Sequence, residues 1–277
     1  LLHLSAHVQA GLKIIFEPGL EATVISTHEE RVKTGGEVLL RLSGMALSRM
    51  SFQTWLARYG HVPLPPYITR NDEKEDQANY QTVYAEMLGS AAAPTAGFHF
   101  SKDLLEKIQS KGICMLFLTL DIGLATFRPI KSEKIEDHQM HEEKVRMSPA
   151  FVKQFQEMNN SGKRIVAVGT TVVRALEAWA HRCQNQGIIP GTQDSAMDFS
   201  TNLFIQPGYQ FQIVDDLITN FHLPKSTLLV LVAAAMGGTA EVMSAYECAE
   251  ANQYRFLSYG DAMFIRGLRT GTFFQQD

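Results

Sequence analysis

The sequence predicts an α/β protein that is preceded by a short stretch of β-strands alone. From about residue 100 onward, segments with helix-end signals alternate with continuous apolar runs, which is the pattern of α/β folds. Residues 13–42 instead hold three short strand-like runs with no helical segment between them. The chain has 277 residues, of which 45% are apolar. This is enough for a sizeable core in one large domain or two unequal ones.

The all-β stretch consists of "KIIF", "LEATVIS" and "GEVLLRL", joined by the turn sequences "EPG" and "KTGG". These runs predict a small antiparallel sheet or part of a barrel. A helix follows, with Ser51 as N-cap and Gly60 as its stop. The sequence "HVPLPP" then holds three prolines in four residues, which predicts a rigid extended connector. We therefore expect domains at residues 1–60 and 61–277.

The second domain is expected to begin its helix and strand alternation at Ser101, which caps a helix ending at Gly112. A second helix starts at Ser148 with a Ser-Pro pair and ends at Gly162, and a third covers "TVVRALEAWAHRCQNQG". Two more helices are expected from about residues 225 and 240. The expected strands are "ICMLFLTL", "RIVAVGT", "NLFI", "YQFQIV", "DLIT" and "DAMFI".

Charge and cysteine content limit the functional classes. The net charge of −4 supplies no attractive field for nucleic acid, so any basic surface must be local. Three widely spaced cysteines favour a reducing compartment and do not form a zinc pattern. The apolar run Leu228–Met236 is about half the length of a membrane span. We expect a soluble cytoplasmic protein.

Two helix starts carry polar side chains. The stretch "TNFHLPKST" lacks the glycines of a P-loop, but free N–H groups at the following helix start can receive an anion. In "VAVGTTVVRALE", Thr170 and Thr171 follow a buried strand, where α/β proteins place ligand sites. The alternative for both stretches is a capped helix without a ligand.

Three further stretches contain candidate catalytic groups. In "EDHQMHEE", His138 and His141 beside Glu142 suit proton transfer, and a metal site is a second alternative. Taken alone, the stretch favours a solvated charged loop. His99 ends the small-residue stretch "GSAAAPTAGFHF" and is either a ligand contact or a core histidine. The stretch "RFLSYGDAM" sets Tyr259 near a glycine, which suits a base or nucleotide.

Taken together, these stretches resemble one enzyme family. Nearly the whole chain is similar to the S-adenosylmethionine:tRNA ribosyltransferase-isomerase family of queuosine biosynthesis. The blocks that carry the likeness, in chain order, are "HVPLPPYI", "YQTVYA", "AAPTAGFHF", "GLATFRPI", "DHQMHEE", "VAVGTTVVRALE", "LFIQPGYQF", "ITNFHLPKSTLLVLV" and "YRFLSYGDAM".

The resemblance implies a reaction, a fold and partners. The family transfers and isomerises the ribosyl moiety of S-adenosylmethionine onto 7-aminomethyl-7-deazaguanine in tRNA. The products are epoxyqueuosine in the tRNA, adenine and methionine. The implied fold is a barrel-like α/β main domain with a small inserted antiparallel β-barrel. No metal and no prosthetic group are implied, since S-adenosylmethionine is a co-substrate. The implied protein is a cytoplasmic monomer without membrane contact, and its macromolecular partner is tRNA carrying the modified wobble base.

The site residues are assigned by matching residue types to this chemistry, which needs a base at the ribose C5′ and an acid for the leaving adenine. The catalytic candidates are His99, Asp121, His138, His141 and Glu142. The substrate-binding candidates are Thr95, Arg128, Thr170, Thr171, Arg174, Asn220, His222, Lys225, Ser226, Tyr259 and Asp261.

The chain also departs from the family pattern. In "TLDIGLATF", Asp121 stands where the family has His and Ala125 where it has Gly. In "TNLFIQPGY", Asn202 replaces an acid and Gln206 an aromatic residue. Family members have a segment with an "NDTRV"-like motif before the small barrel, and we expect residue 1 of this sequence to lie after that segment. The second hypothesis is therefore a truncated, non-catalytic member that retains at most tRNA binding. The third is a generic α/β nucleotide enzyme.

Overall fold

The computed structural model divides the chain into two compact units, Leu1–Pro63 and Leu64–Asp277. The structure describes residues 8–27, 29–30, 38–87, 89–90, 92–123, 130, 132, 134–187 and 196–269. Each unit has its own hydrophobic core.

The first unit is a three-stranded antiparallel sheet followed by two helices. Strands β1 (Lys13–Phe16), β2 (Leu20–Val24) and β3 (Leu40–Ser43) pair in chain order. Helix α2 (Ala46–Arg49) precedes α3 (Phe52–Tyr59), whose first turn is capped by the Ser51 hydroxyl. Leu20, Ala46 and Trp55 form the buried core. The predicted strands and helix of this stretch are confirmed.

Three helices of the second unit are capped at their N-termini by serine side chains. The hydroxyls of Ser101, Ser148 and Ser226 each accept the amide hydrogen three residues on, and so cap α5, α6 and α8. The helical elements are α4 (Asp76–Asn79), η1 (Thr95–His99), α5 (Lys102–Ser110), η3 (Ile135–Asp137), α6 (Pro149–Asn160), α7 (Thr170–Asn185), α8 (Thr227–Ala235) and α9 (Thr239–Ala251).

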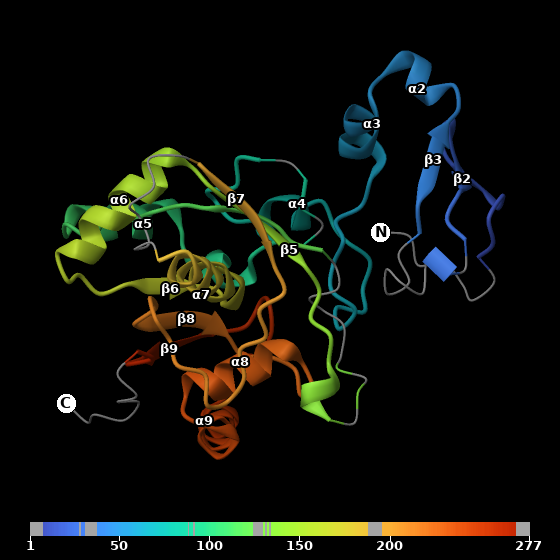
Figure 1. Cartoon of the computed structure of the whole chain (residues 1–277). Coiled ribbons are helices and arrows are strands. Elements are labelled where there is room, and N and C mark those ends of the chain that lie inside the picture. Colours follow the sequence, from blue (N-terminus) through green and yellow to red (C-terminus); the bar gives the residue numbers. More distant parts are fainter. Residues whose placement is uncertain are drawn as a thin grey trace. The chain divides into compact units, whose positions relative to one another are not determined.

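Two further sheets complete the second unit. Strands β4 (Thr119–Asp121), β5 (Glu143–Met147) and β7 (Met197–Thr201) form an antiparallel sheet. In the other sheet β8 (Asp216–Asn220) lies in the middle, parallel to β6 (Val166–Val168) and antiparallel to β9 (Ala262–Arg266). Helix α7 runs beside β6 and β8, and α9 packs on α8 (Figure 1).

The predicted α/β class is confirmed, whereas the barrels are not seen in the described part of the chain. All the strands assigned there belong to three sheets of three strands, and each sheet has two free edges. The division into units falls at Pro63, within the proline-rich connector.

Three strand predictions are largely wrong. In "ICMLFLTL" the strand begins only at Thr119, and Ile113 and Phe117 are 54% and 51% exposed. The short β4 pairs with β5 alone over three residues, so a longer strand has no ladder to join. The segments "NLFI" and "YQFQIV" are irregular, and the strand of this region is β7, which precedes them.

The buried carboxylate of Glu177 explains why "YQFQIV" is not a strand. Its two oxygens accept the backbone N–H groups of Gln212, Ile213 and Val214 at 2.8–3.0 Å. Backbone donors that a side chain satisfies do not need a neighbouring strand.

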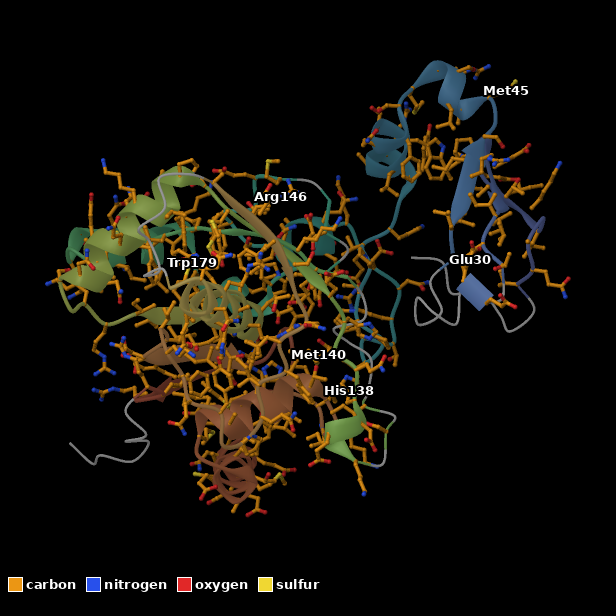
Figure 2. The ribbon with its side chains drawn as sticks, in the orientation of Figure 1. Glu30, Met45, His138, Met140, Arg146 and Trp179 are labelled. Carbon is orange, nitrogen blue, oxygen red and sulfur yellow. The ribbon has the colours of Figure 1, made fainter. Side chains whose placement is uncertain are left out.

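The core of the second unit is built around α7 and α8. Trp179 on α7 is fully buried and packs on Phe151 and Phe155 of α6 (Figure 2). Within the described residues, no single helix has the length and apolar composition of a membrane span. Only α8 and α9 taken together pass this test, and they are bent by 102°.

Candidate functional site

The candidate site lies where the parallel strands β6 and β8 end. Because parallel strands end at the same edge of a sheet, the residues after them are brought together. Thr170 and Thr171 follow β6 and begin α7, while Asn220 ends β8. Gly169 allows this turn with a φ of +98° and lies close to Ala96 of η1. The structure thus brings η1 to the ends of both strands.

Asn220 joins η1 to β8 and to the loop after α9. It is only 2% exposed. Its side-chain oxygen accepts the Thr95 hydroxyl at 3.0 Å. Its nitrogen lies 2.9 Å from Nε2 of His99 and donates to the Leu257 carbonyl at 3.2 Å. Three of the predicted site residues therefore form one hydrogen-bonded group.

The ionisation of His99 is governed by burial and by a nearby acid. Burial lowers the pKa of His99 below its usual value, because the charged ring loses hydration there. The carboxylate of Asp261 acts in the opposite direction, since negative charge favours the protonated ring. The site therefore favours a neutral imidazole near pH 7.

Residues 255–261 form a closed loop beside His99. The Asp261 carboxylate accepts the backbone N–H of Arg255 at 2.7 Å and its guanidinium at 2.9 Å. These contacts lower the pKa of Asp261, so it stays ionised. The Tyr259 hydroxyl donates to Asp76 at 2.8 Å, and Arg70 holds the same carboxylate with two hydrogen bonds. The Tyr259 ring remains 40% exposed.

Aromatic packing fixes the start of the second unit to this loop. The rings of Tyr80 and Phe98 are 5.1 Å apart, and that of Tyr259 lies 5.6 Å from Tyr80. The buried Ser258 hydroxyl bonds to both Tyr67 and Tyr80. Burial raises the pKa of both tyrosines, which keeps them neutral. The loop with Tyr259 and Asp261 is thus held rigidly next to η1.

A second group of predicted residues lies one turn further along α7. The buried side chains of Arg174 and Glu143 form an ion pair at 2.8 Å. Arg174 also donates to the Leu203 carbonyl at 2.9 Å and, more weakly, to that of His141 at 3.4 Å. Burial lowers the pKa of Arg174, and the charge of Glu143 opposes this effect. The ion pair ties the start of β5 to α7.

These residues line a small pocket at the start of α8. Figure 2 shows His138 and Met140 beside α8, which contributes Thr227, Leu228 and Leu231. The cavity volume is ≈ 20 Å³, which is room for about one or two water molecules. The other lining residues are His141, Glu143, Arg174, Phe204 and Ile205.

The two histidines of "EDHQMHEE" do not share a helix face. The short helix η3 ends at Asp137, and both residues line the pocket from outside any helix. Burial lowers the pKa of His138. Glu142 is exposed, whereas Glu143 begins the buried face of β5. The proton-transfer role of Glu142 stays a prediction.

The remaining predicted residues lie around these groups. Asp121 ends β4 and pairs with Arg146 of β5 at 2.7 Å, where both side chains are partly exposed. Ser226 caps α8, and Lys225 before it has a φ of +57° and an exposed side chain. Arg128 and Ala125 lie outside the described residues. The described residues contain no group of three His, Cys, Asp or Glu that is able to hold a metal ion.

His222 points into the core. Its Nε2 lies 3.0 Å from the Thr219 hydroxyl, and its backbone N–H donates to Tyr246. Burial lowers the pKa of His222 to about 4. Its predicted ligand contact is not tested by this arrangement, but its ring is already enclosed by protein.

The predicted site residues did not include several residues that the structure brings to the site. Glu143, Phe204 and Thr227 line the pocket, and Asp76 holds Tyr259. The alternation of β5 was the one available signal, because Glu143, Val145 and Met147 share its buried face. Tyr259 lies 183 positions from Asp76, so no local sequence pattern indicates their contact.

The fold and the grouped residues define an α/β protein with a candidate ligand site at the carboxyl ends of parallel strands. A family model described as "Queuosine biosynthesis protein" matches residues 1–265. The chain therefore belongs to the queuosine biosynthesis protein family.

Three curated relatives are named S-adenosylmethionine:tRNA ribosyltransferase-isomerase. The protein from Trichlorobacter lovleyi is 43% identical over 96% of this chain and 72% of its own length. The protein from Halothermothrix orenii is 51% identical over 77% and 60%. The protein from Treponema denticola is 44% identical over 92% and 69%. The matched part of this chain thus corresponds to between 60% and 72% of each relative.

A solved structure is also similar. The S-adenosylmethionine tRNA ribosyltransferase from Thermotoga maritima is 29% identical, with a TM-score of 0.48. The match covers 93% of this chain and 66% of that protein.

Proposed function

We propose that this protein transfers and isomerises the ribosyl moiety of S-adenosylmethionine onto 7-aminomethyl-7-deazaguanine in tRNA. Membership of the queuosine biosynthesis family carries the proposal, because relatives that are 43–51% identical bear the name of this enzyme. The products are epoxyqueuosine in the tRNA, adenine and methionine. S-adenosylmethionine is a co-substrate, and the enzyme needs no prosthetic group.

The grouped polar residues at the strand ends support an active site there. The sulfonium of S-adenosylmethionine acidifies the C5′ protons of the ribose, so a base starts the reaction. We assign proton transfer and hydrogen bonding at the reacting atoms to the histidines and carboxylates among the candidate residues. The proposed residues are His99, Asp121, His138, His141 and Glu142.

The substrate contacts are proposed from the same arrangement. Thr170 and Thr171 begin α7, where backbone N–H groups and the helix dipole favour the methionine carboxylate. The exposed ring of Tyr259, held by Asp76, suits a planar base. The other proposed contacts are Thr95, Arg128, Arg174, Asn220, His222, Lys225, Ser226 and Asp261.

The wider properties follow from the same proposal. The enzyme acts in the cytoplasm as a monomer, and tRNA carrying the modified wobble base is its partner, without membrane contact. The barrel-like arrangement of the main domain and the small inserted β-barrel at residues 1–60 are part of the proposal.

The experiment is an assay with tRNA that carries 7-aminomethyl-7-deazaguanine and labelled S-adenosylmethionine. We expect release of adenine and methionine and the appearance of epoxyqueuosine in the tRNA. Unmodified tRNA with the same anticodon is the control and should give no product. A folded chain that binds this tRNA but releases no adenine would contradict the proposed activity and favour a non-catalytic family member.

A further inference from the structure

The buried amide of Asn220 has chemically defined neighbours. Its oxygen accepts from the Thr95 hydroxyl, while its nitrogen faces His99 Nε2 and the Leu257 carbonyl. A backbone carbonyl is only an acceptor, so the amide atom 3.2 Å from Leu257 must be the nitrogen. The Thr95 hydroxyl can donate or accept, so it is compatible with this orientation and donates to the amide oxygen. The orientation of the amide is therefore fixed by the Leu257 carbonyl.

This orientation determines which ring nitrogen of His99 carries the proton. An amide nitrogen only donates, so His99 Nε2 must accept its hydrogen at 2.9 Å. A ring nitrogen that accepts is unprotonated, and the hydrogen of the neutral ring then lies on Nδ1. If Nε2 were protonated, its N–H would face the N–H of Asn220, and the hydrogen bond between the two side chains would be lost. Asn220 thus disfavours the charged ring and blocks Nε2 as a base.

The other ring nitrogen is suited to contact a ligand. His99 is partly exposed and lies beside the strand ends that form the candidate site. Among the residues that the structure describes, none forms a hydrogen bond with Nδ1. Asn220, in contrast, is 2% exposed, and both hydrogens of its amide are already used. Within the described residues, Nδ1–H of His99 is therefore available to donate to a ligand, whereas the amide of Asn220 has no further hydrogen to donate.

We propose that Asn220 is a positioning residue that holds His99 neutral, and that Nδ1–H of His99 donates a hydrogen bond to the purine that leaves. This inference rests on the proposed function. Negative charge develops on the purine as its bond to the ribose breaks, and a preorganised donor stabilises it. A neutral imidazole has no readily lost proton, so His99 acts here as a hydrogen-bond donor. Proton transfer then falls to other groups.

The first test needs no activity. Nitrogen-15 NMR of histidine-labelled protein distinguishes protonated from unprotonated ring nitrogens, and a His99→Asn sample identifies the His99 signals. We expect hydrogen on Nδ1 and none on Nε2 at pH 7. Hydrogen on Nε2, or a doubly protonated ring, would overturn the inference even if the enzyme is active. The expected tautomer in an inactive protein would contradict the proposed function but preserve the positioning role of Asn220.

The second test changes one atom of the positioning residue. Asn220→Asp replaces the donor by a carboxylate, so the hydrogen of His99 should move to Nε2 and the pKa of His99 should rise by about 1–3. Asn252→Asp, at an exposed asparagine after α9, is the matched control and should change neither. An unchanged His99 spectrum in folded Asn220→Asp protein would overturn the inference.

The third test separates donation from proton transfer in the active enzyme. His99→Asn keeps an N–H donor near the position that Nδ1 of His99 occupies. The kcat of this variant should therefore stay within about tenfold of the wild-type value. His99→Ala should lose about 100-fold, as for other preorganised donors. Equal losses in the two folded variants, with a pH profile that loses one ionisation, would assign proton transfer to His99 and overturn the donor role.

Discussion

At the scale of single residues, burial decides how each polar side chain of the site behaves. Asn220 and His222 are neighbours on the chain, yet they face different surroundings. Asn220 links three segments at the edge of the site, whereas His222 is enclosed in the core beside Thr219 and Tyr246. The sequence marked both residues as candidates, because polar residues beside an apolar helix are conspicuous. It could not show that the partner of Asn220 is His99, 121 positions away.

The buried ring of His222 predicts a loss of stability in mild acid. Its pKa is about 4 in the folded state and about 6.5 when unfolded. Below pH 6.5 the unfolded chain therefore binds more protons, and the folded state loses stability until pH 4. The free energy of unfolding should fall by about 3 kcal/mol over this range from His222 alone.

Urea titrations at several pH values measure this dependence. His222→Gln should be less stable at pH 7 but should show a shallower decline between pH 6.5 and 4. His61→Gln, at an exposed histidine, is the control and should decline as the wild type does. Parallel curves for His222→Gln and the wild type would show that His222 is not the group that titrates.

At the scale of elements, the sequence predicted helices better than strands. A helix end is set by residues within one turn, so Ser51, Ser101 and Ser148 were recognisable as caps. A strand needs a partner strand, and in the second unit every such partner is distant in sequence. The apolar run "ICMLFLTL" has the composition of a buried strand, but only its last residues find the β5 ladder. Backbone N–H groups of "YQFQIV" donate to the carboxylate of Glu177 instead of to a neighbouring strand.

The contacts of Glu177 predict a specific effect of its amide analogue. Glu177→Gln places an NH2 group against one or two of the backbone donors of Gln212, Ile213 and Val214. A buried donor without an acceptor is costly, so the free energy of unfolding should fall by about 2 kcal/mol. Hydrogen exchange should accelerate first at the amides of residues 212–214.

Exchange followed by NMR, together with urea unfolding, measures both effects. Glu247→Gln on α9 is the matched control, because Glu247 is exposed. A Glu177→Gln protein with unchanged protection at residues 212–214 would show that the carboxylate does not hold this segment.

At the scale of the whole molecule, the chain consists of two units with separate cores. The smaller core contains Leu20, Ala46 and Trp55, whereas the larger one extends over α6 to α9 and their sheets. A small core supplies less hydrophobic stabilisation, so the units are expected to differ in stability. Each unit has one of the two tryptophans, Trp55 or Trp179.

The two tryptophans allow the units to be observed separately. We expect the first unit to unfold at lower urea concentration than the second. Fluorescence of the wild type should therefore show two steps. Trp55→Phe should retain only the later step, reported by Trp179. A single transition, with the same midpoint in both proteins, would show that the units unfold together.

The contacts between the first and the last part of the second unit have a consequence for folding during translation. Tyr67 contacts Ser258 across 191 positions, and Asp76 contacts Tyr259 across 183. The same loop supplies the Leu257 carbonyl that fixes Asn220. Before residues 255–261 are made, the nascent chain has η1 and α7 but lacks the loop that contacts Asn220. These contacts of the second unit therefore form only after residues 255–261 have been made, because they join segments that are 183 and 191 positions apart.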